Sequence, residues 1–108
     1  MQIVAETDGI IGSIMESIHE AGMADNTLVM IVSDHGGIGN SHGGETVEES
    51  NVTFIYHGKG IKKNYEVRQT VYMYDVAAHV AFALGLKAPY AWTGRPTLAA
   101  FEGYSEPE

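Results

Sequence analysis

The sequence predicts an α/β fold with a mostly parallel sheet. The patterns follow one another as helix, apolar strand, long polar loop, strand and helix. The first strand is almost continuously apolar, which is typical of a strand covered on both faces in a parallel sheet. Such a strand needs strand neighbours on both sides and helices on both faces. We therefore expect residues 1–108 to form a single partial domain of a larger sheet, or to complete their core by association.

The first half of the chain gives the clearest patterns. Apolar residues recur at a helical period from Gln2 to Ala21, and Gly22 is a natural helix end. Thr27 to Ser33 is the apolar strand, and Gly36 to Glu49 is glycine-rich and polar without periodicity, which indicates a loop. Asn51 to Tyr56 predicts a second strand.

The second half predicts one helix followed by irregular chain. Met73 to Leu84 has a helical pattern that ends at Gly85, and the chain from Lys87 onward is expected to be irregular. The side chains expected to face inward from this helix are Val76, Val80, Ala83 and Leu84.

Composition excludes several classes of protein. Six basic and fourteen acidic residues give a formal charge of −8, so nucleic-acid binding through a basic face is not expected. The chain has no cysteine, which excludes disulfides and thiolate metal sites. No apolar stretch has the length of a membrane span, and no signal peptide is visible.

The residues with the clearest chemical meaning follow the apolar strand. Ser33-Asp34-His35-Gly36-Gly37 stands at the strand's carboxyl end, where open α/β sheets collect ligands. A carboxylate and an imidazole suit zinc, and less selectively manganese or iron, provided that the glycines let the chain turn. His42 can return to the same place through the loop. The alternative is a polar turn that carries a surface histidine.

Several segments resemble the alkaline phosphatase superfamily, which includes sulfatases, type I phosphodiesterases and nucleotide pyrophosphatases. The central match is Asp25-Asn26-Thr27-Leu28-Val29 followed by Ile31-Val32-Ser33-Asp34-His35-Gly36. Weaker matches are Asp8, Gly12, Ile18 and Gly22; Val52-Thr53-Phe54-Ile55-Tyr56 with Gly58-Lys59-Gly60; Tyr74-Asp75-Val76-Ala77 with Gly85-Leu86; and Trp92-Thr93-Gly94-Arg95-Pro96. The resemblance implies the C-terminal part of a three-layer α/β/α catalytic domain.

The resemblance also implies a site with two divalent metal ions, commonly zinc, with manganese or calcium as alternatives. Asp34 and His35 would bind the ion nearest the nucleophile, and His42 would bind the second ion. In sulfatase-like members a histidine in a comparable loop contacts the oxyanion of the substrate instead. No residue of this chain matches the family's nucleophile, so we assign no catalytic residue here and expect the isolated chain to bind metal poorly and to be inactive.

We expect a metal-dependent hydrolase of phosphate esters, a phosphodiesterase or phosphatase, acting on a small anionic substrate. The alternatives are a sulfatase, a mutase of the cofactor-independent phosphoglycerate type, and a non-catalytic metal-binding or interaction module. A sulfatase would use a formylglycine nucleophile and usually one calcium ion, and many sulfatases have asparagine or glutamine where this chain has His35. The resemblance implies a periplasmic or secreted protein, and the incomplete sheet implies possible self-association.

Other ionisable residues have simpler interpretations. His19 and His79 are expected to be structural or surface residues. His57 ends the second strand and, in a parallel sheet, would lie at the same edge as the motif. Glu45, Glu48 and Glu49 form an acidic stretch that solvation explains, with Glu45 able to orient a ligand histidine. Lys59, Lys62 and Lys63 make a small basic surface.

Overall fold

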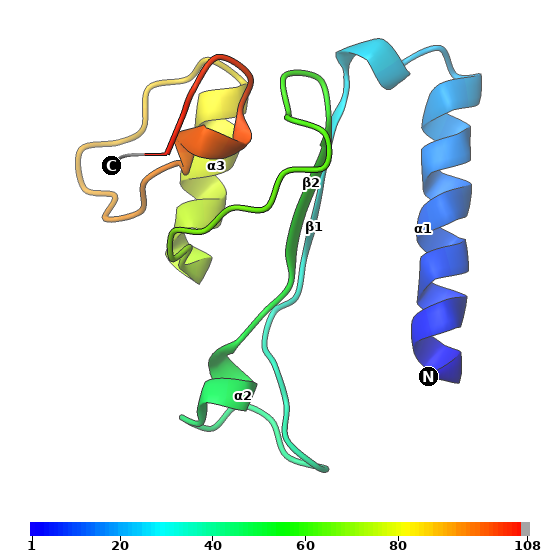
Figure 1. Cartoon of the computed structure of the whole chain (residues 1–108), viewed down its shortest axis with the longest axis vertical. Coiled ribbons are helices and arrows are strands. Elements are labelled where there is room, and N and C mark those ends of the chain that lie inside the picture. The colour runs from blue at the N-terminus through cyan, green and yellow to red at the C-terminus, as the bar shows by residue number, and fades with distance from the viewer. Residues whose placement is uncertain (107–108) are drawn as a thin grey trace.

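Two helices flank a pair of strands in the computed structural model, which describes residues 1–106 (Figure 1). The strands are β1 (Leu28–Val32) and β2 (Phe54–Gly58). Helix α1 (Gln2–Glu20) lies on one side of them and helix α3 (Val76–Ala83) on the other. The arrangement is α/β, as the sequence predicts.

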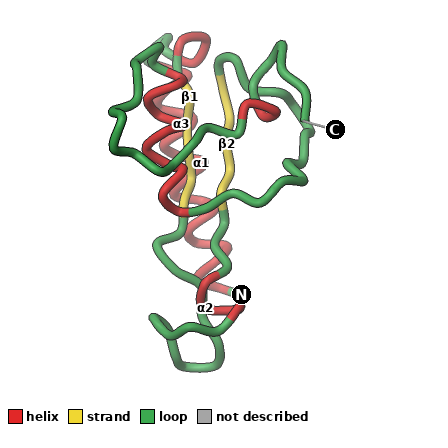
Figure 2. Tube along the Cα trace, turned by 90° about the vertical axis from the view of Figure 1, so that its left-hand side faces the viewer, coloured by secondary structure: helices red, strands yellow, loops and turns green. Residues whose placement is uncertain are grey.

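Three short 3-10 turns and one short helix complete the secondary structure of the described residues. The turns are η1 (Ala24–Asn26), η2 (Met73–Asp75) and η3 (Leu98–Ala100). The short helix is α2 (Val47–Ser50), inside the segment expected to be a loop. Figure 2 shows that α2 and the loop before it extend beyond one end of the strands.

The two strands pair antiparallel, and the expectation of parallel pairing is wrong for them. Leu28 stands opposite Gly58, and Val32 stands opposite Phe54. A parallel partner requires a crossover that returns the chain to the start of the sheet, usually through a long helix. Here the connection leaves and re-enters at the same end, and its one helix has four residues. His57 consequently pairs with Val29 and lies at the end of the sheet away from Asp34, so its expected place beside the motif is also wrong.

Helix α1 follows its predicted bounds but has no buried side chain. Gly22 adopts φ +70°, as expected for the residue that ends a helix. Ile3, Ile10 and Ile14 are 77%, 62% and 53% exposed, whereas Ile11, Met15 and Ile18 are half-buried, so the apolar side of α1 is only partly covered among the described residues. No helix in the described part of the chain combines the length and apolar character needed to cross a bilayer.

The small core lies between β2, α3 and the C-terminal segment. Its main cluster consists of the buried residues Ile61, Ala100 and Phe101, with Tyr56 and Phe82 packed against them. The inward face expected for α3 is wrong for three of its four residues, because Val80 is 43% and Leu84 is 68% exposed and Ala83 is exposed as well. The buried residues of α3 are instead Ala78, His79 and Ala81. Because this helix is apolar on all sides, its sequence pattern does not select one face.

A buried polar network joins α3 to the chain that follows it. The carboxylate of Asp75 accepts the backbone N–H of Tyr72 at 2.8 Å and that of Arg95 at 2.9 Å. His79 donates from Nδ1 to the carbonyl of Asp75 at 2.7 Å, and its Nε2 accepts the N–H of Thr97 at 2.9 Å. The side chain of His79 is completely buried, and each of its ring nitrogens has a partner. These bonds position the Gly94-Arg95-Pro96 segment against α3.

The buried imidazole predicts that acid weakens this packing. Burial lowers the pKa of His79 below 6.5, while the carbonyl and charge of Asp75 raise it to a smaller extent. The unfolded chain therefore takes up its proton first, so stability falls as the pH drops below about 6.5 and is insensitive to this group above that value. Urea unfolding should show a lower midpoint at about pH 5.5 than at about pH 7.5. The difference should shrink in His79→Gln, and an equal difference in both proteins would contradict the assignment.

Candidate metal and anion site

The candidate site begins where the strand ladder ends. Ser33 follows β1, and its backbone N–H donates to the carbonyl of Thr53 at 3.1 Å, which closes the base of the loop between the two strands. Its hydroxyl donates to the carbonyl of His35 at 2.6 Å. These two bonds turn the chain directly after the strand, so Asp34 and His35 project beyond the ladder instead of alternating across it.

The imidazole of His35 is held in one tautomer and faces Asp34. Its Nδ1 lies 2.7 Å from the carbonyl oxygen of Gly36, which can only accept, so Nδ1 carries the proton. Its Nε2 then presents a lone pair, 3.5 Å from Oδ2 of Asp34. The Asp34 side chain is 87% exposed and that of His35 is 43% exposed. The Nε2 of His35 and the carboxylate of Asp34 are thus two electron-pair donors directed at the same point, an arrangement suited to binding a cation.

A tight turn brings His42 back to His35. Ile38 and Ser41 exchange backbone hydrogen bonds of 3.1 and 2.9 Å across the turn, and Gly39 adopts φ +57° at its first central position. The rings of His35 and His42 then lie with centroids 4.7 Å apart, tilted by 42°. The glycine-rich loop therefore returns the second histidine to the first, as its composition predicts.

The donor pair fits a small divalent cation, whereas the full ligand set is not assembled. Bonds of about 2.1 Å to zinc place adjacent tetrahedral ligands about 3.4 Å apart, close to the separation of Oδ2 and Nε2. A carboxylate oxygen and an imidazole nitrogen are suitable donors for zinc or manganese, while calcium prefers oxygen alone. Among residues 1–106, however, no group of three or more such side chains is arranged to hold an ion. His42 touches His35 without completing a three-donor pocket.

Gly36 connects the motif to α2 through a contact that only glycine permits. A Cβ atom at this position would lie 2.0 Å from the carbonyl oxygen of Glu48 and 2.5 Å from that of Asn51. The backbone N–H of Gly36 also donates to the carbonyl of Glu49 at 2.8 Å. The turn of α2 therefore packs directly against the backbone that follows His35.

The structure assigns Glu49 a role that the sequence interpretation missed. Its side chain is 5% exposed, and its carboxylate accepts the hydroxyls of Ser41 at 2.9 Å and Thr46 at 2.7 Å. Hydrogen bonds from Thr46 and then Ser41 hold the pKa of Glu49 below its ordinary value. Thr46 in turn caps α2 by accepting the Glu49 N–H. The spacing Thr46-x-x-Glu49 is the capping-box pattern, which would have singled out this glutamate. Glu45 is exposed, as expected for a solvated side chain.

The remaining candidates lie away from this loop. His19 is an exposed residue in the last turn of α1. Lys59 donates to the side-chain oxygen of Asn26 at 2.6 Å, and Lys62 stands 4.4 Å above the ring of Tyr65. Lys59 and Lys62 therefore make structural contacts at the end of the sheet opposite Asp34.

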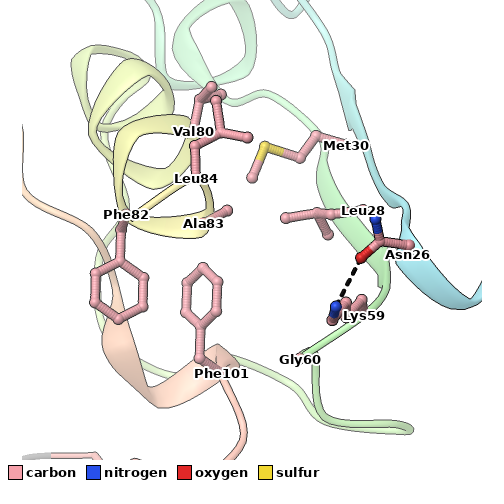
Figure 3. Close-up of a pocket in the computed structure, with 10 residues that line it drawn as sticks. All are labelled: Asn26, Leu28, Met30, Lys59, Gly60, Val80, Phe82, Ala83, Leu84 and Phe101. Carbon is pink, nitrogen blue, oxygen red and sulfur yellow. Dashed lines mark hydrogen bonds between the residues drawn. The ribbon is translucent and has the colours of Figure 1, made fainter. Parts of the chain in front are cut away.

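A mostly apolar cavity of about 710 Å³ lies between β1 and α3 (Figure 3). Met30 and Leu28 point into it from β1, and Val80 and Leu84 reach it from α3. Lys59 is its only charged lining residue, and Asn26 already binds that ammonium group. The cavity does not include Asp34, His35 or His42, so it is separate from the candidate metal site.

Comparison with known proteins identifies the family of the chain. The family model described as Sulfatase matches residues 1–86. Arylsulfatase K of Danio rerio is 31% identical over 77 residues, covering 67% of this chain and 15% of that protein. The Mus musculus protein of that name is 28% identical over 109 aligned positions, with 96% and 20% covered. For the Homo sapiens protein the identity is 26% over 95 residues, with 83% and 18% covered.

No solved structure matches the chain. The chain spans only 15–20% of the length of these three relatives. Sulfatases generally use a divalent metal ion, which is consistent with the donor pair at the end of β1. Because the family model covers most of the sequence, including both histidines of the site, the chain belongs to the sulfatase family of hydrolases, within the alkaline phosphatase superfamily.

Proposed function

We propose that the intact protein hydrolyses sulfate esters and that this chain contributes Asp34, His35 and His42 to its metal-and-anion site. The observation that carries the choice of ester is that the relatives described above are named arylsulfatases. The sequence interpretation favoured phosphate esters and kept sulfate esters as the alternative. Membership of the sulfatase family now favours that alternative.

The residues of this chain have separate tasks in the proposed site. Asp34 supplies negative charge that balances a cation, and its exposed carboxylate is free to bind one. The Nδ1–H of His35 is committed to the Gly36 carbonyl, so the free Nε2 is presented as a ligand in a fixed orientation. Asp34 and His35 would hold a divalent ion there, and the ion would supply stabilisation of the negative charge that develops on an ester oxygen. His42 stands beside His35, where it binds a second ion or contacts the sulfate group.

The choice of metal follows from the donors. An imidazole nitrogen next to a carboxylate favours zinc or manganese over calcium. If calcium is the ion, His35 is expected to contact the substrate or to hold Asp34 in place instead of binding the metal. Metal substitution therefore tests the role of His35 as well as the identity of the ion.

The decisive experiment compares esters and metals in the intact gene product. Nitrophenyl sulfate should be hydrolysed with a kcat/KM about tenfold or more above that of nitrophenyl phosphate, a difference of about 1.4 kcal/mol. Removal of metal with EDTA should abolish the activity, and separate additions of zinc, manganese and calcium should identify the ion that restores it. Preference for a phosphate ester would overturn the sulfate proposal. Full activity after complete metal removal would overturn the metal-dependent site.

A further inference from the structure

Glu49 forms hydrogen bonds to both halves of the candidate site. Its backbone carbonyl accepts the N–H of Gly36, the residue after His35. Its carboxylate accepts the hydroxyl of Ser41, the residue before His42. The two segments that carry the histidines are thus joined through one glutamate, in addition to the turn that connects them.

The surroundings of the carboxylate leave little freedom of movement. One oxygen of Glu49 is held by Ser41 and the other by Thr46. A Cβ atom on Gly44 would lie 2.4 Å from Oε2 of Glu49, so the loop backbone passes directly over the carboxylate. An ionised carboxylate accepts hydrogen bonds and donates none, so both hydroxyls must point toward it. The loop on either side of His42 is therefore fixed by a single buried acid.

We propose that Glu49 is a positioning residue that sets the separation of His35 and His42. When the Glu49 carboxylate is removed, Ser41 loses its hydrogen bond and the backbone at Gly44 loses its contact. The segment that carries His42 then moves independently of Gly36. The ordering of the loop depends only on the contacts described here, whereas the consequence for hydrolysis rests on the proposed function.

Three variants of the intact protein test the proposal. Glu49→Ala removes the anchor, Ser41→Ala removes one hydroxyl and leaves the anchor in place, and Glu48→Ala is the matched control. Glu48 precedes Glu49 in α2 and carries the same charge, but its side chain is exposed. Amide hydrogen exchange at Gly36, Ile38 and Ser41 reports the ordering of the loop, because each of these N–H groups is hydrogen-bonded.

Glu49→Ala should accelerate exchange at these amides about tenfold or more, and Glu48→Ala should leave it unchanged. Ser41→Ala should give an intermediate effect at Ile38 and Ser41, and it decides the matter if Glu49→Ala does not fold. Exchange equal to wild type in Ser41→Ala, and in a folded Glu49→Ala protein, would overturn the proposal.

Metal retention and kinetics test the consequence for the site. If the proposed function is right, Glu49→Ala should lose about 10- to 100-fold in metal affinity or in kcat with a smaller change in KM, as is typical when a residue that orients ligands is removed. Ordinary sulfatase kinetics and metal retention in a variant whose loop exchanges fast would refute the positioning role. Absence of sulfate ester hydrolysis in the wild type would refute the proposed function, while the exchange measurements would still decide whether Glu49 orders the loop.

Discussion

Asp34→Asn in the intact protein is expected to lower kcat/KM for a sulfate ester about 100- to 1,000-fold, because the several kcal/mol of charge stabilisation that a metal supplies depend on its anionic ligand. The substitution keeps the size of the side chain and removes its charge. Asp34 is exposed and forms no buried contact, so the protein should remain folded. Metal content after dialysis should fall together with activity.

Asp25→Asn provides the matched control for this prediction. Asp25 is an exposed aspartate in η1, at the opposite end of β1 from the site. Its replacement makes the same change in charge and should leave kcat/KM and metal content near wild type. If Asp34→Asn instead retained wild-type activity and bound metal, Asp34 would not be a ligand, and the polar-turn interpretation of the motif would stand.

His79→Ala is expected to lower the free energy of unfolding by about 3–5 kcal/mol, the range for deletion of a large buried ring that also leaves polar groups unpaired. The ring of His79 lies among those of Phe54, Tyr56 and Phe101, with centroids 5.3, 5.0 and 6.5 Å away. Its removal leaves a cavity in the core and leaves the N–H of Thr97 without its hydrogen-bond acceptor. Urea unfolding measures the loss.

Two further variants separate the causes of that loss. His57→Ala removes an exposed imidazole from β2 and should change stability by less than about 0.5 kcal/mol. His79→Phe keeps most of the volume of the ring but no nitrogen, so its cost reports the hydrogen bonds to Asp75 and Thr97. A His79→Ala protein as stable as the His57→Ala protein would contradict the structural role of the buried imidazole.

Local sequence patterns predicted the helices and strands of this fold better than the way in which these elements pair and pack. The helical period of α1 and the apolar run of β1 gave their bounds to within about a residue, because both patterns are long and uninterrupted. The predicted direction of strand pairing was wrong, because the direction is set by the path of residues 33–53 and not by the sequence of either strand. The inward face of α3 was wrong because His79 is buried through two hydrogen bonds that a hydrophobic pattern does not register.

For the candidate site, too, the sequence predicted the positions of residues better than their contacts. The position of Asp34 and His35 after the apolar strand β1 was predicted, and the glycines around His42 correctly indicated a loop that returns. The role of these three residues as metal ligands stays a prediction. Glu49 was overlooked because an acidic stretch resembles solvated surface, although the capping-box spacing from Thr46 distinguishes Glu49 from its acidic neighbours.

The hydrogen bond between Ser33 and Thr53 has a consequence for how such a protein can vary. This bond closes the base of the loop between β1 and β2, so the rest of that loop can change length without altering the strand register. The entropic cost of closing a loop rises only with the logarithm of its length, so doubling the length of this loop costs about 0.6 kcal/mol. Length changes in this loop would therefore leave the strands as they are, whereas the placement of His42 still depends on the contacts of Ser41 and Gly44 with Glu49. The strand scaffold and the loop that carries the histidines can thus vary separately.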